Sequence, residues 1–207
     1  MNNNPEAIAI GCKLLNEDYS WQYFSGGQFL TLKRLINYFL FLDRLFSNSN
    51  FFSGLYLQKI PHSIKQVDWI SGACMMVRRE PLDKIGLLNE NYFMYFEDME
   101  WCFRFKEQKW KIYFLPYESI MHYHAKSMEH QTNKIYKESI KNFYKVYKLI
   151  NKTNDLFILK LVMVCGYFFR TVFYLCVAII QRNQTDKKKL ILNYNFLKAS
   201  VLMALSQ

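Results

Sequence analysis

The sequence predicts an α/β domain over residues 1–130, followed by helices over residues 131–207. Three observations carry this prediction. Before residue 130 short apolar runs alternate with turns and short helical segments, which is the pattern of layered α/β domains. Beyond it lysines recur at helical spacing, and the apolar segment 156–180 follows them.

The composition narrows the class of protein. A chain of 207 residues is long enough for one domain with a sizeable core and an appendage. A hydrophobic content of 51% and a mean hydropathy of -0.12 exclude both a disordered chain and a polytopic membrane protein. The net charge of +10 calls for an anionic partner.

The cysteines and the N-terminus indicate the compartment. The five cysteines are widely separated and form no C-x-x-C pair, which favours reduced thiols in the cytoplasm over a disulfide framework or a zinc site. They are Cys12, Cys74, Cys102, Cys165 and Cys176. The first residues show no basic stretch followed by an apolar one, so we expect no signal peptide.

Two strands are predicted in the first half of the domain. Residues 7–15, "AIAIGCKLL", are apolar and end at the turn "NEDYS", as a buried strand does. Residues 67–79 are predicted as a second strand, in which Gly72 and Ala73 allow a close approach of the backbone.

Helices and a further strand follow. Pro81 suits the first position of a helix and Gly86 suits its end, so a helix of about two turns is expected between them. Residues 97–110 predict another helix and residues 111–116 another strand. The pattern of residues 25–60 predicts neither a helix nor a strand.

The lysines after residue 130 form a stripe along one face of a predicted helix. They are Lys134, Lys137, Lys141, Lys145 and Lys148. Apolar side chains cover much of the rest of this helix, so the stripe could also be the solvated face of a core helix. Because these lysines lie beside apolar helices, they favour an anionic lipid surface over a nucleic acid.

The apolar segment 156–180 is long enough to span a ~30 Å hydrocarbon core at ~1.5 Å per residue. Arg170 would then lie near the middle of the bilayer, at a cost of roughly 2.5–3.5 kcal/mol. Basic residues flank the segment on both sides, against the positive-inside tendency of a single crossing. We therefore expect a helix or helical hairpin embedded in the cytoplasmic leaflet; a transmembrane span and a soluble core helix are the alternatives.

Two adjacent acids, Glu97 and Asp98, stand in the aromatic run "NYFMYFEDMEWCFRF" at residues 91–105. Carboxylates in the first turn of a helix offset its dipole by about 0.3–1 kcal/mol each, which is one explanation for them. A carboxylate at a helix start, walled by aromatic rings, can also serve as a general base.

The surrounding motifs carry a family resemblance. "VDWISGA" at residues 67–73 is followed by Arg78 and Arg79, by "GLLNENYFMYFEDMEWCFR" at 86–104, and by a strand with "HYHAKS" at 122–127. This order resembles the acceptor half of family 2 glycosyltransferases, especially the rhamnosyltransferase-like branch. The upstream "NPEAIAIGCKLLNEDYS" resembles the segment that follows the donor half, so the likeness covers residues 5 to about 130.

The resemblance implies a partial GT-A, Rossmann-like fold and an inverting transfer of a sugar from a nucleotide-sugar donor to an acceptor hydroxyl. It makes Asp98 the general base, with Glu97 orienting it or holding the acceptor. It also implies substrate contacts for Asp68, Trp69, Gly72, Ala73, Arg104 and His122.

Each substrate contact has a structural alternative. Asp68 could simply end a strand, and Trp69 could be a core residue. Gly72 and Ala73 would equally suit tight packing. Arg104 could pair with Glu100 one helical turn away instead of touching a diphosphate.

The histidines are also open to two interpretations. His122 matches the histidine of the family and could contact the leaving diphosphate or its metal, or be structural. Like His122, His124 has no aspartate, glutamate or cysteine nearby, so the two alone make a poor metal site.

The sequence also departs from the family pattern. Asn89 replaces an aspartate, which we expect to weaken a loop hydrogen bond, and Ala125 replaces a glycine. No D-x-D element, G-x-G-x-x-G or P-loop occurs, so we expect a C-terminal portion without the donor-binding half, whose acidic residues would hold Mg or Mn.

The predicted function is an inverting glycosyltransferase segment acting on a cell-envelope or lipid-linked glycan. Its predicted location is the cytoplasmic face of the membrane, as a peripheral or monotopic protein. The alternative is a non-catalytic remnant or membrane-binding module that has lost the donor site.

Overall fold

The computed structural model describes residues 1, 4–123, 133–181 and 183–205. The chain forms two compact units. Unit 1 comprises Met1–Phe29 and Gly54–His130, and unit 2 comprises Leu30–Ser53 and Gln131–Gln207. Most of the stretch without a sequence-based assignment thus belongs to unit 2.

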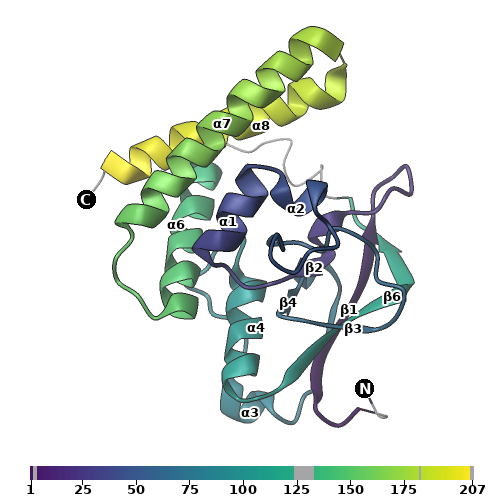
Figure 1. The fold of residues 1–207 in the computed structure, drawn as a ribbon. Coiled ribbons are helices and arrows are strands. Elements are labelled where there is room, and N and C mark those ends of the chain that lie inside the picture. Colours follow the sequence, from purple (N-terminus) through teal and green to yellow (C-terminus); the bar gives the residue numbers. More distant parts are fainter. Residues whose placement is uncertain (2–3, 124–132, 182, 206–207) are drawn as a thin grey trace. The chain divides into compact units, whose positions relative to one another are not determined.

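A mixed sheet forms the centre of unit 1, as expected for an α/β fold (Figure 1). Its order is β3 (Lys65–Val67), β6 (Lys111–Met121), β1 (Ala7–Leu15) and β5 (Met75–Val77). Strand β1 runs parallel to β6 and antiparallel to β5, and β6 is antiparallel to β3. The predicted strand 7–15 is confirmed, and its largely buried side chains explain its apolar sequence.

Strand β6 continues beyond the predicted end at residue 116. The pairing with β1 skips from Cys12–Leu115 to Lys13–Ser119, which marks a bulge around Pro116. A bulge accommodates a proline because the residues within it leave the hydrogen-bond ladder. The proline therefore interrupts the strand without ending it.

The continuous strand predicted for residues 67–79 is wrong. The chain forms β4 (Trp69–Ile70), a 3-10 turn η2 (Gly72–Cys74) and then β5. The hydroxyl of Ser71 accepts a hydrogen bond from the Ala73 amide at 3.3 Å, which favours the turn over an extended chain. Strand β4 pairs with β2 (Gly26–Gly27), which follows a short 3-10 turn, η1 (Tyr23–Ser25).

Two of the predicted helices lie in unit 1. The first, α3 (Leu82–Ile85), is shorter than the two turns expected, and Gly86 ends it with a φ of 82°. The second, α4 (Glu97–Glu107), ends three residues before the predicted limit. It packs on β4 and β6 through buried side chains that include Met99, Cys102 and Phe105.

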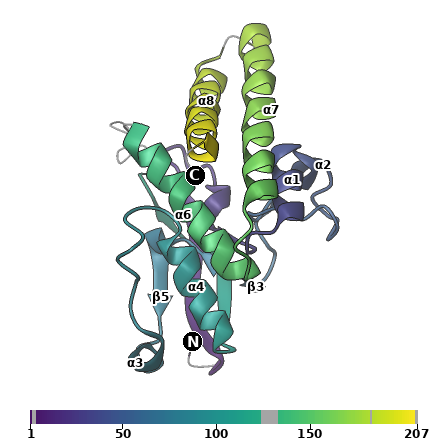
Figure 2. The ribbon, with the colours of Figure 1, turned by 90° about the vertical axis from the view of Figure 1, so that its left-hand side faces the viewer.

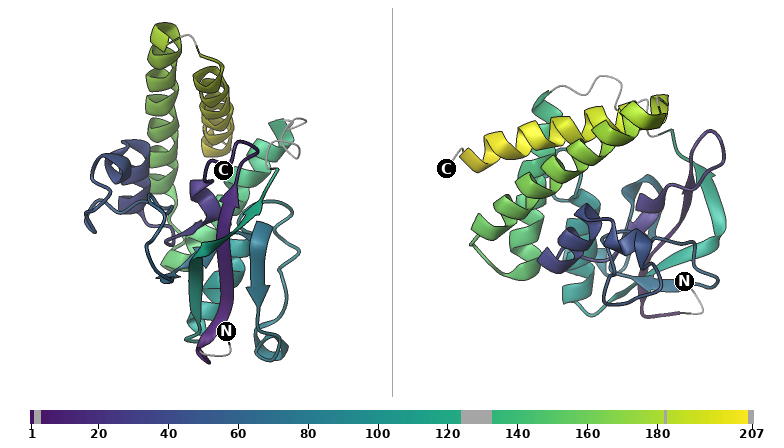
Figure 3. Two further views of the ribbon diagram at one scale, coloured as in Figure 1. Left: turned by 90° about the vertical axis from the view of Figure 1, so that its right-hand side faces the viewer. Right: turned by 45° about the horizontal axis from the view of Figure 1, so that its top comes forward.

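Unit 2 is helical. It contains α1 (Leu32–Phe39), α2 (Leu42–Leu45), α6 (Asn133–Asn151), α7 (Phe157–Gln181) and α8 (Gln184–Leu205). Thr31 caps α1 by accepting a hydrogen bond from the Arg34 amide at 3.2 Å. Helices α7 and α8 lie side by side as a hairpin (Figures 2 and 3).

The exposure of the side chains can be compared with the predicted lysine stripe and the predicted apolar helix. In α6, Lys134, Lys137 and Lys141 are exposed, while the opposite face buries aromatic and aliphatic side chains. Among the described residues, α7 is the helix that is long and apolar enough to cross a membrane, judged by length and composition.

Candidate functional site

Asp98 and Gly72 are brought together by the first turn of α4 and the turn η2. The Gly72 amide donates a hydrogen bond to Asp98 Oδ2 at 3.0 Å, and the Met99 amide donates to Oδ1 at 2.7 Å. Asp98 keeps part of its surface exposed, and Gly72 and Ala73 are exposed. Burial raises the pKa of the Asp98 carboxyl, and the backbone amides that donate to it oppose this effect.

The contact with Asp98 does not require a glycine at position 72. A Cβ added at Gly72 would lie 3.6 Å from Asp98 Cβ, which is ordinary van der Waals contact. The amide at this position, and not the lack of a side chain, is therefore what holds Asp98. Of the residues predicted to contact substrate, Gly72 is the one whose contact with the predicted base the structure shows.

Glu97 is the second acid of the pair. Burial raises the pKa of its carboxyl, and the charge of Asp98 raises it further. Its Oε2 is buried and has no hydrogen-bond partner among the described residues. Two residues with positive φ, Tyr95 at 64° and Phe96 at 71°, lead into the pair, so the backbone here adopts a conformation that is uncommon for side chains of this size.

Arg104 takes the structural role named as its alternative. Its guanidinium forms two hydrogen bonds with the Glu100 carboxylate, at 2.9 and 3.0 Å. It also donates to the carbonyl oxygens of Ile85 and Leu87, both at 2.6 Å. The two terminal guanidinium nitrogens thus hold the loop around Gly86 while Nε holds Glu100, and a diphosphate contact would compete with these bonds.

Asp68 and Trp69 also make internal contacts. Asp68 accepts a hydrogen bond from the Phe29 amide at 3.0 Å and forms an ion pair with Lys106 of α4. The Trp69 ring is buried, and its Nε1 donates to the Gln28 carbonyl at 3.1 Å. This burial matches the core alternative for Trp69.

His122 is held by a residue that the sequence did not single out. Gln22 is buried, its Nε2 donates to the His122 carbonyl at 2.8 Å, and its Oε1 lies 2.9 Å from His122 Nδ1. The His122 amide donates to the Leu15 carbonyl at 2.9 Å. His124 lies outside the described residues.

The two departures from the family motif have different outcomes. Asn89 Oδ1 accepts a hydrogen bond from the Asn91 amide at 3.0 Å, so this loop retains a side-chain bond of the kind an aspartate would make. Ala125 lies outside the described residues.

A divalent cation has no complete ligand set in the described part of the chain. No three side chains of histidine, cysteine, aspartate or glutamate gather there in a way that could hold a metal ion. Mg²⁺ is usually held by one or two carboxylates together with waters and substrate phosphates, so the carboxylates described here could supply only part of its six-oxygen shell.

Comparison with protein families shows that residues 4–140 match the family described as "Glycosyltransferase like family 2". No solved structure matches the chain. The family match covers both the sheet of unit 1 and the acid pair at the start of α4.

Three curated relatives match shorter stretches. The chain is 33% identical over 70 residues to the N-acetylglucosaminyl-diphospho-decaprenol L-rhamnosyltransferase of Mycobacterium tuberculosis, covering 34% of this chain and 23% of that protein. It is 31% identical over 78 residues to the rhamnosyltransferase WbbL of Escherichia coli, covering 36% and 30%. It is 43% identical over 47 residues to the low-salt glycan biosynthesis hexosyltransferase Agl10 of Haloferax volcanii, covering 23% and 15%. The chain thus matches less than a third of the length of each relative.

Proposed function

Since this chain belongs to glycosyltransferase family 2, in its rhamnosyltransferase-like branch, we propose that Asp98 is the general base of an inverting sugar transfer. The observation that carries the proposal is the position of Asp98. Its carboxylate is anchored by the Gly72 amide, has a raised pKa and remains partly exposed.

The proposed chemistry is a single displacement. Asp98 takes the proton of an acceptor hydroxyl as the oxygen attacks the anomeric carbon of the donor sugar. The bond from that carbon to the nucleoside diphosphate breaks, and the diphosphate leaves with the electron pair. Because attack and departure occur on opposite faces, the anomeric configuration inverts.

The raised pKa suits this role. A carboxylate whose pKa lies above its ordinary value is a stronger base and takes a hydroxyl proton more readily. The Gly72 amide fixes the direction of Oδ2, while each oxygen keeps a further lone pair for the acceptor. Glu97, whose pKa is raised and whose Oε2 has no hydrogen-bond partner in the described part of the chain, is proposed to hold the acceptor or orient Asp98.

The proposed partners follow from the relatives. One relative is named for a decaprenol-linked diphosphate substrate, so we assign a nucleotide-sugar donor and a lipid-linked or cell-envelope glycan acceptor. Since an acceptor with a polyprenyl tail lies in a membrane, we propose that the protein works at the cytoplasmic face of that membrane, as a peripheral or monotopic protein. Residues other than those described here would hold the Mg or Mn that is common in the family.

The test is a transfer reaction with a preparation that contains this chain and binds the donor. UDP- and dTDP-sugars are offered with magnesium or manganese and a polyprenyl-diphosphate-linked N-acetylglucosamine. We expect a glycosylated lipid whose new linkage has the anomeric configuration opposite to that of the donor, determined by NMR. A product with retained configuration, or no product, would contradict the proposal and favour a non-catalytic module.

A further inference from the structure

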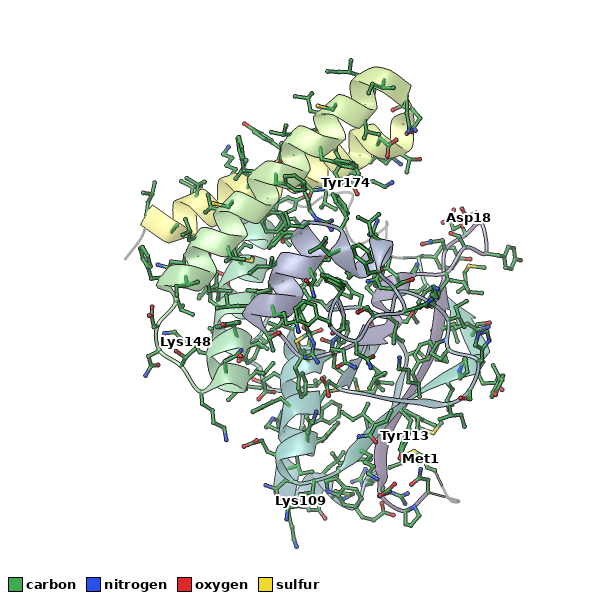
Figure 4. All side chains as sticks on the ribbon, viewed as in Figure 1. Met1, Asp18, Lys109, Tyr113, Lys148 and Tyr174 are labelled. Carbon is green, nitrogen blue, oxygen red and sulfur yellow. The ribbon has the colours of Figure 1, made fainter. Side chains whose placement is uncertain are left out.

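Helix α7 carries two opposite stripes along its length. One stripe is buried within unit 2 and comprises Leu159, Met163, Gly166, Arg170 and Tyr174. The other, here called the open stripe, consists of Leu161, Phe168, Val172 and Ile179, which are 54%, 60%, 44% and 65% exposed. At 3.6 residues per turn these four fall on one side of the helix, opposite the buried stripe. Figure 4 shows side chains projecting outward along α7.

Arg170, the one charged residue between Lys160 and the end of α7, belongs to the buried stripe. Its guanidinium donates to the Tyr38 carbonyl and lies 3.8 Å from the Tyr38 ring and 4.2 Å from the Phe41 ring. Buried Asp43 of α2 interacts with it electrostatically. The Arg170 guanidinium therefore has its contacts on α1, on Phe41 and on α2, and it does not face the open stripe.

The same contacts argue against a transmembrane crossing by α7. Gly166 lies so close to Phe39 of α1 that an added Cβ would sit 2.2 Å from the ring. Crossing a bilayer would require α7 either to leave α1 and α8 or to take their polar residues with it. An orientation along the bilayer keeps all of these contacts and brings the open stripe to lipid.

The distribution of charge between the two units indicates which kind of partner the open stripe binds. Unit 2 has 16 lysines and arginines against 4 acids, a formal charge of +12, whereas unit 1 has 11 against 13, a charge of -2. Exposed lysines of unit 2 include Lys134, Lys137 and Lys141 on α6 and Lys187 and Lys188 on α8. A second copy of unit 2 would bring like charges together. An anionic bilayer offers both acyl chains and negative headgroups.

We propose that α7 lies in the plane of an anionic bilayer, with the open stripe immersed at the boundary between headgroups and acyl chains and the lysines of unit 2 at the headgroups. The proposal rests on the proposed function and deepens it by naming the surface through which the chain binds a membrane that holds a lipid-linked acceptor. The contacts and charges that support it are those of unit 2. Its test needs no sugar donor, so its failure is distinguishable from failure of the transfer assay.

The first experiment is vesicle flotation of the chain. Vesicles of phosphatidylcholine alone are compared with vesicles containing about a third phosphatidylglycerol. We expect binding to the anionic vesicles that weakens with salt. The double variant Phe168→Asp/Ile179→Asp should bind at least ~10-fold more weakly, because it places two charges in the apolar boundary. Tyr19→Asp, which adds one carboxylate at a 75% exposed side chain of unit 1, should bind as the wild type does.

The second experiment measures depth. Cys165 and Cys176 are exposed on α7, 11 positions apart, which is about 16 Å along a helix. Nitroxide labels placed singly at each thiol, with Cys74 replaced by serine, should report the same shallow depth in anionic vesicles. Depths that differ by about 16 Å would show a crossing helix and overturn the proposal.

Three other results would overturn it. The first is a chain that circular dichroism shows to be folded but that does not bind vesicles. The second is a Phe168→Asp/Ile179→Asp variant that binds as well as the wild type. The third is a dimer in solution that this double variant dissociates. The last result would identify the open stripe as an interface between copies.

Discussion

Replacing Arg104 by methionine removes a cation on which a buried carboxylate depends. Glu100 is 4% exposed, and both of its oxygens receive hydrogen bonds from Arg104. The substitution leaves that carboxylate without its partner and also frees the carbonyl oxygens of Ile85 and Leu87. Methionine has a similar length, so the change is mainly one of charge and hydrogen bonding.

The expected loss is a large part of the stability of unit 1. Removing one partner of a buried ion pair costs about 3–5 kcal/mol. The Arg104 side chain is 26% exposed, so water can reach part of the vacated site, and we expect the lower end, about 3 kcal/mol. The two carbonyl oxygens add little, because the loop around Gly86 is exposed and water can replace their donor.

Urea unfolding followed by tryptophan fluorescence measures this loss in the relevant unit. Trp21, Trp69, Trp101 and Trp110 all lie in unit 1, and Trp101 donates a hydrogen bond to the Gly86 carbonyl at 3.0 Å.

Two controls separate charge from packing. Glu100→Gln combined with Arg104→Met should cost at least ~1 kcal/mol less than Arg104→Met alone, because a neutral amide is less costly to bury. Lys84→Met, at an exposed cation of α3, should change stability by less than ~0.5 kcal/mol. A loss below ~1 kcal/mol for Arg104→Met, or a double variant as unstable as the single one, would refute the reasoning.

Three further predictions concern other positions. Because the folded state raises the pKa of Asp98, it holds that proton more tightly than the unfolded state, and stability falls as pH rises through this window. Asp98→Asn should therefore be more stable than the wild type in pH 7 melts, with the difference shrinking on acidification; a less stable variant would contradict this. Cys74 should react with a thiol reagent before Cys102, because Cys102 is buried and burial raises the pKa of its thiol. Mass spectrometry of timed samples measures the two rates, and equal rates would show that Cys102 is not buried. Gly166→Leu should separate α7 from Phe39 and lower the melting temperature, whereas unchanged melting would show that this contact is absent.

Local signals account for the parts of the fold that the sequence predicted well. Strand β1 is an uninterrupted apolar run, and α4 has acids in its first turn and basic residues in its last. The sequence does not predict α1, although Thr31 caps it. The helix has only eight residues, and the positive φ of Phe41 turns the chain soon after it, so the helical pattern is too short to stand out.

Long-range contacts account for much of what the sequence could not predict. The bond between the Gly72 amide and Asp98 joins positions 26 apart, and Gln22 reaches His122 across 100 positions. No local pattern marks such partners, because they meet only when β1, β6 and α4 are assembled. The pairing of Arg104 with Glu100 was foreseeable from their helical spacing, but its hold on the loop around Gly86 was not.

The central claim is that Asp98 is the general base, and the direct measurement is the rate of sugar transfer by an active preparation in which Asp98 is replaced by asparagine. Asparagine can still accept the Gly72 amide but cannot take a proton, so we predict a loss of at least ~10²-fold in kcat, with a native circular dichroism spectrum and unchanged donor affinity. Glu97→Gln should lose less. Turnover by the Asp98→Asn protein at the wild-type rate would contradict the account.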